Sequence, residues 1–148
     1  TKGGTEQVAP VVVPELKITG STINQAIHDA KILIDTQGAA SAVDRVHTVL
    51  HGYLKQVCNE ANITHAQDAT LNQLINTLKL NHPILAIKND NTDHILKSMS
   101  NIFDKLNPIR NSSSLAHANP VLLDHDEAML VINTTNTILA YLNSKFKK

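Results

Sequence analysis

The segment SAVDRVHTVLHGYLKQV, residues 41–57, carries a long helical pattern. Its apolar residues recur at intervals of three and four, the spacing that places them on one face of an α-helix. They are Val43, Val46, Val49, Leu50, Tyr53, Leu54 and Val57. The spacing of Ser41 to Asp44 resembles a capping box and predicts that this helix begins at Ser41. The segment therefore predicts a long amphipathic helix with one buried face.

The same spacing before and after this segment predicts four more helices. The first runs from Ser21 or Thr22 to Gly38, a glycine suited to a left-handed stop. The next begins after Asp68 and stops before Pro83, because proline disfavours a helical residue ahead of it. Expected buried positions in these two are Ile23, Ala26, Ile27, Ala30 and Ile34, then Leu71, Leu74, Ile75 and Leu78.

Two further helices follow in the second half of the chain. One starts near Thr92, and the other opens in the acidic cluster at residues 124–127. Their expected buried residues are Ile95, Leu96, Met99, Ile102, Phe103 and Leu106, then Met129, Ile132, Ile138, Leu139 and Leu142. Strand signals are weak, so the fold class is all-α: an up-and-down bundle of about five helices.

Length and composition indicate one domain. The chain has 148 residues, and its N-terminal part, residues 1–20, is rich in Gly, Pro and Val. We expect residues 1–20 to form a flexible, extended arm or linker and residues 21–148 to form the bundle. No uncharged apolar run approaches the roughly 18 residues of a membrane-spanning helix. We therefore expect a soluble protein that does not act at a membrane.

Charge and cysteine content narrow the function classes. The 13 basic and 13 acidic residues cancel, and aromatic residues make up 3% of the chain, so nucleic-acid contact has to be local. The only cysteine, Cys58, cannot close a disulfide within the chain and fits a small core residue. A lone thiol in the core suits a reducing cytoplasm, which is the location that we expect.

Two histidines share one face of the helix at residues 41–57. His47 and His51 stand at i, i+4, a spacing that can hold a metal ion. However, Thr48 occupies the place of the glutamate that the zincin pattern requires, and no third ligand is evident. Both residues flank the apolar stripe, so they are also interpreted as boundary residues with hydrogen-bonded rings, or as supporting residues beside a site. No metal is expected.

The segment from Arg110 to His117 carries more polar chemistry than packing requires. Arg110 is one of only two arginines, and seven residues later comes His117, with three serines between them. Arginine offers a planar fork of charged donors for a phosphate, and histidine exchanges a proton near neutral pH. The pair therefore suits phosphodiester chemistry. The alternative is that Arg110 and Asn111 cap a helix or bind loop carbonyls.

Arg110-Asn111, followed by five residues and His117, resembles the R-x(4-6)-H signature of HEPN domains. AVDRVHT at residues 42–48, LHGYLK at 50–55 and SLAH at 114–117 resemble the C-terminal (Abi-C) domain of bacterial abortive-infection proteins. The resemblance covers roughly residues 32–142. It implies an antiparallel helical bundle that pairs as a homodimer and brings an arginine and a histidine of each subunit into one cleft.

The resemblance also implies a function in antiviral defence or as a toxin: a metal-independent endoribonuclease without cofactors. Arg110 and His117 are then the catalytic residues, and Asn111, Ser114, His47 and His51 support them or position the RNA substrate. A non-catalytic dimerisation or nucleotide- or RNA-binding module remains the alternative, as does a structural domain that docks a partner. Because the net charge is zero, we expect another domain of a longer protein or a partner to deliver the RNA. An antitoxin that restrains toxicity is a further expected partner.

Overall fold

The computed structural model describes residue 16 and residues 21–85, 91–99, 101 and 124–146. Its helices are α1 (Ser21–Gln37), α2 (Ala39–Glu60), α3 (Leu71–Asn81) and α5 (His125–Phe146), and residues 91–99 form one more helical segment. The described residues contain no strand. The predicted all-α bundle is thereby confirmed, and each of the five predicted helices is present.

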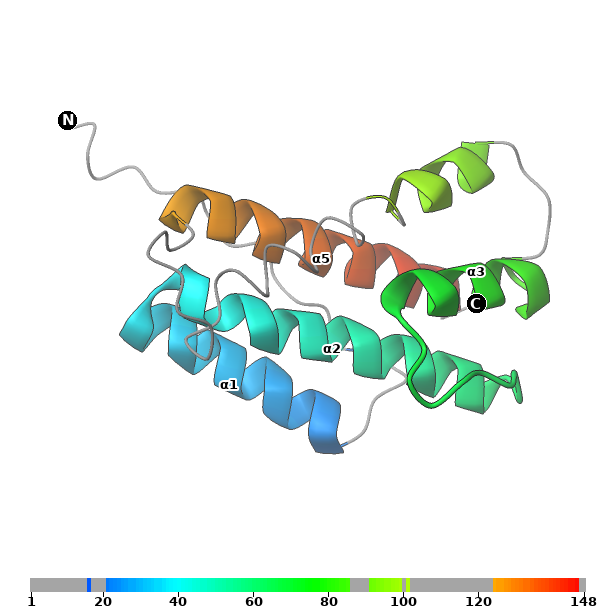
Figure 1. Ribbon diagram of the computed structural model, residues 1–148, viewed down its shortest axis with the longest axis horizontal. Coiled ribbons are helices and arrows are strands. Elements are labelled where there is room, and N and C mark those ends of the chain that lie inside the picture. Colours follow the sequence, from blue (N-terminus) through cyan, green and yellow to red (C-terminus); the bar gives the residue numbers. More distant parts are fainter. Residues whose placement is uncertain (1–15, 17–20, 86–90, 100, 102–123, 147–148) are drawn as a thin grey trace.

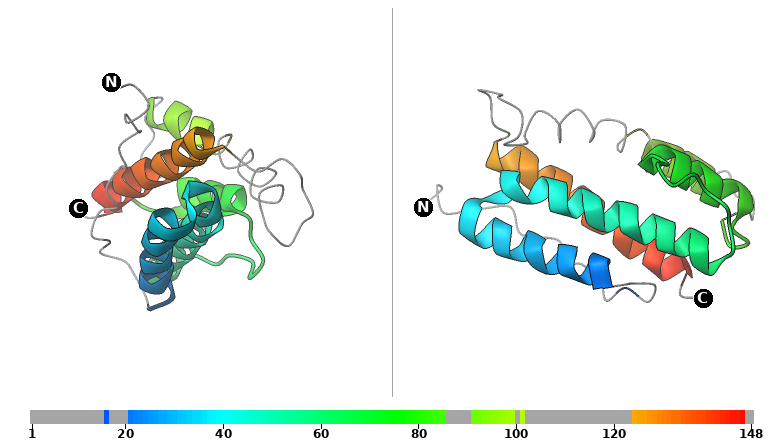
Figure 2. Two further views of the ribbon diagram at one scale, coloured as in Figure 1. Left: turned by 90° about the vertical axis from the view of Figure 1, so that its left-hand side faces the viewer. Right: turned by 60° about the horizontal axis from the view of Figure 1, so that its bottom comes forward.

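The three longest helices define the shape of the bundle. α1, α2 and α5 run along the long axis of the molecule, and α3 and the segment at 91–99 lie at one end of it (Figures 1 and 2). α2 packs against α1, α3 and α5. The segment that carries the clearest apolar pattern is thus the helix around which the others assemble.

A single residue joins α1 to α2. Gly38 has φ +91°, a backbone conformation that L-residues with a side chain rarely adopt, which explains the predicted stop at a glycine. The predicted start of α2 at Ser41 is wrong, because the helix begins at Ala39 with Gly38 as its N-cap. Ser41 is the third helical residue, since the chain reverses at Gly38 and resumes the helix at once.

The start and end of α3 follow the predicted signals. Thr70 is the N-cap: its Oγ1 accepts a hydrogen bond from the Gln73 backbone N–H at 3.2 Å. Gln73 Oε1 in turn accepts the Thr70 N–H at 2.8 Å, which completes a capping box. At the other end the helix stops at Asn81, one residue before His82-Pro83. The predicted stop before proline is confirmed.

α5 begins in the acidic cluster, as predicted. Asp124 precedes the helix, and its Oδ1 accepts a hydrogen bond from the Asp126 N–H at 3.3 Å. Asp126 and Glu127 lie in the first turn, where negative charge stabilises a helix through its dipole. The acidic residues at 124–127 therefore have a structural explanation at this helix start.

The core confirms most of the predicted buried positions. All seven apolar residues named for α2, the four of α3 and the five of α5 are buried. In α1, Ile23, Ala26 and Ala30 are buried, and Ile27 and Ile34 are partly buried. Cys58 is fully buried, as predicted, and burial raises the pKa of its thiol.

One predicted core position is wrong. Ile95 is 47% exposed, whereas its neighbour Leu96 is fully buried and Met99 packs against the core from a partly buried position. In the segment at 91–99, Leu96 therefore faces the bundle and Ile95 faces away from it. Ile102, Phe103 and Leu106 lie outside the described residues.

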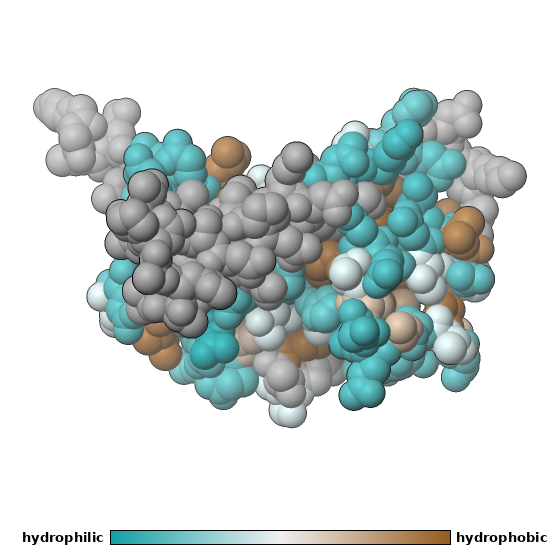
Figure 3. All heavy atoms as spheres, in the orientation of Figure 1, coloured by the Kyte–Doolittle hydropathy of each residue, from teal (hydrophilic) through white to brown (hydrophobic). Residues whose placement is uncertain are grey.

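Across residues 21–85, 91–99 and 124–146, no helix is both long enough and apolar enough to cross a membrane. Hydrophobic side chains reach the surface in separate places among hydrophilic ones (Figure 3). In the part of the chain that the structure describes, the exposed large apolar residues are Ile32, Leu80, Ile95 and Leu130.

Candidate functional site

The predicted site residues fall into two groups. Arg110, Asn111, Ser114 and His117 lie outside the residues that the structure describes, so their roles stay predictions. His47 and His51 lie on α2 and can be placed. The described part of the candidate site therefore consists of α2 and the elements that contact it.

His47 and His51 stand one turn apart at the edge of the buried face of α2. Both are half-buried, and their ring centroids are 5.9 Å apart with the planes inclined by 34°. This agrees with the interpretation that they flank the apolar stripe. Within the described residues no group of three or more His, Cys, Asp or Glu side chains is placed to hold a metal ion.

The ring of His51 is fixed by the loop between α2 and α3. Its Nε2 lies 2.7 Å from the carbonyl oxygen of Ala69, eighteen residues further along the chain. A carbonyl oxygen only accepts hydrogen bonds, so Nε2 carries the proton that it donates. One nitrogen of His51 is therefore committed to holding the loop, which suits a supporting residue better than a proton-transfer group.

Lys55 holds the same loop one turn further along α2. Its Nζ donates a hydrogen bond to the Gln67 carbonyl oxygen at 2.7 Å. His65, within the loop, lies with Nε2 at 3.1 Å from Asn59 Oδ1 at the end of α2. These three contacts connect α2 to residues 65–69 through side chains. They keep the loop close to His51 and bring the chain to the Thr70 cap of α3.

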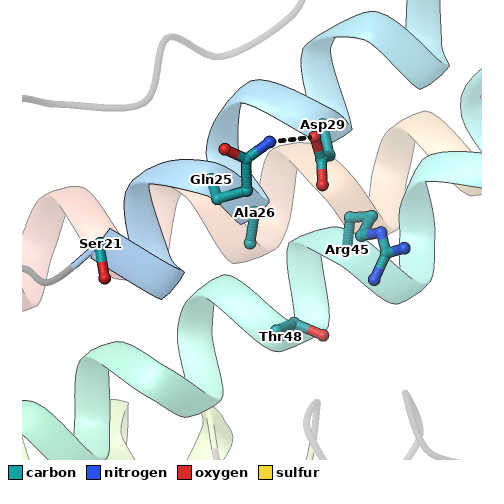
Figure 4. A pocket seen from close by; sticks show the side chains of 6 residues that line it. All are labelled: Ser21, Gln25, Ala26, Asp29, Arg45 and Thr48. Carbon is teal, nitrogen blue, oxygen red and sulfur yellow. Dashed lines mark hydrogen bonds between the residues drawn. The ribbon is translucent and has the colours of Figure 1, made fainter.

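A polar groove of about 410 Å³ lies between α1 and α2. Gln25 and Asp29 line it from α1, and Arg45 and Thr48 line it from α2 (Figure 4). Gln25 Nε2 donates a hydrogen bond to Asp29 Oδ1 at 2.8 Å. Arg45, the second of the two arginines, is exposed here. No role was predicted for Arg45 from the sequence, although its rarity was a signal.

A second groove, of about 510 Å³, lies where the loop meets α3. Hydroxyl, imidazole, amide and carboxylate groups line it, from Thr64, His65, Asp68, Thr70, Gln73 and Thr77. Thr70 and Gln73 already pair in the capping box, and His65 contacts Asn59. Much of the polar surface of this groove therefore has a structural role.

Another histidine, His82, belongs to an apolar cluster at the C-terminal end of α5. Its ring centroid lies 4.5 Å from that of Phe146, which is itself 6.5 Å from Tyr53. His82 Nδ1 accepts a hydrogen bond from the Ile84 N–H at 3.2 Å. Burial lowers the pKa of His82 and raises that of Tyr53, so both groups favour their neutral forms. The cluster is structural.

Sequence reasoning missed three polar residues that α5 buries: Thr135, Asn136 and Asn143. Thr135 Oγ1 donates to the Val131 carbonyl at 2.9 Å, and both asparagines have interacting partners. Asn136 and Asn143 each follow a buried apolar residue, Ile132 and Leu139, by four positions. That spacing on the buried face was the signal that they are not solvent-facing.

The whole described bundle matches one known family. The Abi_C family model, described as a HEPN-like domain, matches residues 21–146. The chain therefore belongs to the HEPN-like Abi_C family, as the resemblance in its sequence indicated. The matched range starts with α1 and ends with α5, and it includes Arg110 and His117. Comparisons with curated proteins and with solved structures give no match.

Proposed function

We propose that this protein is a metal-independent endoribonuclease that acts in abortive infection, as a toxin or an antiviral effector in the cytoplasm. The observation that carries the proposal is the family match over residues 21–146, which contains the arginine and histidine of the R-x(4-6)-H pattern. The active form is a homodimer with one composite site, because each chain supplies a single Arg110 and His117 pair.

The reaction needs a base, an acid and a stabilising cation. His117 removes the proton of a ribose 2′-hydroxyl, and the resulting oxygen attacks the adjacent phosphate. Arg110 stabilises the phosphorane through its bidentate guanidinium. The second copy's His117 protonates the leaving 5′-oxygen as the P–O bond breaks. The products are a 2′,3′-cyclic phosphate end and a 5′-hydroxyl end, and DNA is spared because it lacks the attacking group.

The remaining predicted residues act around this centre. Asn111 and Ser114 position the phosphate or the segment that carries the pair. His47 and His51 border the cleft from α2, and the hydrogen bond from His51 Nε2 to Ala69 supports a role in positioning. Because the chain has no net charge, RNA is delivered with the help of another domain or a partner rather than by long-range attraction. An antitoxin is a further partner and restrains toxicity.

The test compares His117→Ala with a matched histidine variant, His28→Ala, which changes an exposed residue of α1. Wild type and both variants are incubated with single-stranded and structured RNA, including transfer RNA, in excess chelator, and the new ends are identified. We expect His117→Ala to lower the rate by about 100- to 10,000-fold, the usual cost of losing a proton-transfer group. His28→Ala should match wild type.

Two further variants sharpen the assignment of roles. Arg110→Lys should also cleave poorly, since one ammonium group does not reproduce the bidentate fork. His47→Ala and His51→Ala should weaken cleavage without ending it. Wild-type activity that disappears with chelator would replace this mechanism by a metal-dependent one. If wild type binds RNA but cleaves none, the protein is a binding module instead.

A further inference from the structure

The polar groove between α1 and α2 contains two opposite charges. Asp29 lines it from α1, and Arg45 lines it from α2 (Figure 4). On a helix, a charged side chain is stabilised by an opposite charge three or four positions away. The residues at those positions around Asp29 and Arg45 are all uncharged: Gln25, Ala26, Ile32 and Leu33, then Ser41, Ala42, Thr48 and Val49. Neither charge therefore stabilises its own helix through such a pair.

The Arg45 guanidinium has no partner across the groove either. It forms no hydrogen bond or ion pair with any residue in the described part of the chain. Asp29 Oδ1 accepts a hydrogen bond from Gln25 Nε2, and a carboxylate has about four acceptor positions, so Asp29 can accept further donors. The acidic neighbour of Arg45, Asp44, projects about 100° away around α2 and does not line the groove.

The charges of the groove select the chemistry of a ligand. A free phosphate is attracted by Arg45 but repelled by Asp29, and a simple cation meets the reverse. A nucleotide suits both, because its phosphate pairs with a guanidinium and its base carries N–H donors. Guanine fits the carboxylate best, since N1–H and the N2 amino group lie side by side on its Watson–Crick edge. The other three RNA bases present no such pair of adjacent donors.

The shape of the groove favours a nucleotide within a longer chain. Its volume of about 410 Å³ is large enough for a small ligand, but Ser21, Gln25 and Arg45 are exposed, so the groove is open to solvent. A site for a free small molecule ordinarily encloses most of its ligand. An open groove suits one unit of a polymer, because the polymer gains the rest of its binding at other contacts.

We propose that this groove binds a guanine nucleotide of the RNA substrate, with Asp29 accepting from the base and Arg45 pairing with the phosphate. The proposal rests on the proposed function and gives it a specificity-determining site. Arg45 and His51 are six residues apart on α2, so they project about 120° apart around the helix and lie about 9 Å apart along it. The bound guanine therefore lies near the cleaved bond, while another nucleotide occupies the cleft that His51 borders.

The first test measures binding without cleavage. It uses His117→Ala as the background, so that the RNA stays intact, and a labelled oligouridine with one central guanine as the probe. We expect Arg45→Gln to raise the dissociation constant at least about 10-fold, the usual effect of losing a charge-assisted hydrogen bond. Lys31→Gln is the matched control, because Lys31 is exposed on α1 and does not line the groove. It should bind as the background does.

The salt dependence of binding identifies the phosphate contact. For a single strand, each phosphate contact contributes about 0.7 to the slope of log K against log salt concentration. Arg45→Gln should reduce the slope by that amount, and Lys31→Gln should leave it unchanged. Circular dichroism checks that each variant keeps its helices.

The second test replaces the guanine by inosine, which lacks only the N2 amino group. In the background variant the inosine probe should bind about 5- to 10-fold more weakly than the guanine probe. With Asp29→Asn added, the two probes should bind alike, because the amide offers one acceptor oxygen beside a donor group. Asp35→Asn, at an exposed position of α1 outside the groove lining, should keep the preference for guanine.

Three results overturn the proposal. The guanine and inosine probes bind the background variant equally, Arg45→Gln binds RNA as Lys31→Gln does, or guanosine monophosphate competes as well as the oligomer, which indicates a site for a free nucleotide. Failure of the proposed function looks different. A guanine preference that Asp29→Asn removes, in a protein whose wild type cleaves no RNA, keeps the groove and removes the nuclease. Cleavage that is unchanged in Asp29→Asn and Arg45→Gln keeps the nuclease and removes the groove.

Discussion

α2 and α5 are equally long, at 22 residues each, and pack against each other, yet they bury different side chains. The buried residues of α2 are aliphatic, apart from Tyr53 and Cys58, and its histidines stand at the edge. α5 buries Thr135, Asn136 and Asn143 among its aliphatic residues. α2 therefore provides apolar stability, whereas α5 combines apolar burial with buried polar groups.

The largest expected effect comes from the apolar face of α2. Leu54 is fully buried, so Leu54→Ala removes apolar contacts and leaves a cavity. We expect the free energy of unfolding to fall by about 2 to 5 kcal/mol. Urea unfolding measures it, with Leu80→Ala on the surface of α3 as the control, which should stay within about 0.5 kcal/mol of wild type. A small loss at Leu54 would show that α2 is not the apolar centre.

An intermediate effect is expected where α5 buries an amide. Asn136 is 6% exposed and has interacting partners, so Asn136→Ala leaves buried polar groups without their contacts. The expected loss is about 1 to 3 kcal/mol. On α2, Thr48 Oγ1 donates to the Asp44 carbonyl at the surface, and Thr48→Ala should change stability by less than about 0.5 kcal/mol. Equal losses in the two helices would remove the distinction drawn between them.

The smallest effect concerns pH at the end of α5. Burial lowers the pKa of His82 below its ordinary 6.5, so the unfolded chain binds a proton more readily than the folded one. Stability is therefore highest above pH 6.5 and decreases as the pH falls from 6.5 through the lowered pKa. Protonation also removes the acceptor for the Ile84 N–H.

Thermal midpoints between pH 5 and 8 check this prediction. His82→Gln should flatten the decrease on the acid side. His51→Ala should keep the decrease, because this substitution leaves His82 and its contacts with Phe146 and Ile84 unchanged. A wild-type midpoint that stays constant over this range would contradict the role given to His82.

Helix positions and core residues were predictable because apolar spacing is a local signal that packing reinforces. The prediction that α2 begins at Ser41 was wrong, because a capping pattern carries no information about where the preceding helix ends. Ile95 failed because Ile95 and Leu96 both fit a spacing of three or four, and only tertiary packing chooses between them. Asn136 and Asn143 were missed because a polar residue among apolar ones is normally interpreted as a break in the apolar face of a helix, and not as a buried residue.

The candidate site was predictable to a smaller extent. The positions of His47 and His51 at the edge of the buried face followed from helix geometry. The partner of His51 did not, because Ala69 lies eighteen residues away and offers a backbone carbonyl, which no sequence motif marks. The catalytic pair Arg110 and His117 remains a prediction that rests on the family and on the residue types.

The single-residue joint at Gly38 has a kinetic consequence. α1 and α2 are in contact along their lengths and are separated by one residue, so closing this hairpin loses very little chain entropy. Contacts that are local in sequence form early in folding. The α1–α2 hairpin should therefore be formed in the transition state, before α5 docks. Substitutions of residues in the contact between α1 and α2 will mainly slow folding. Substitutions of residues in the contact between α2 and α5 will mainly speed unfolding.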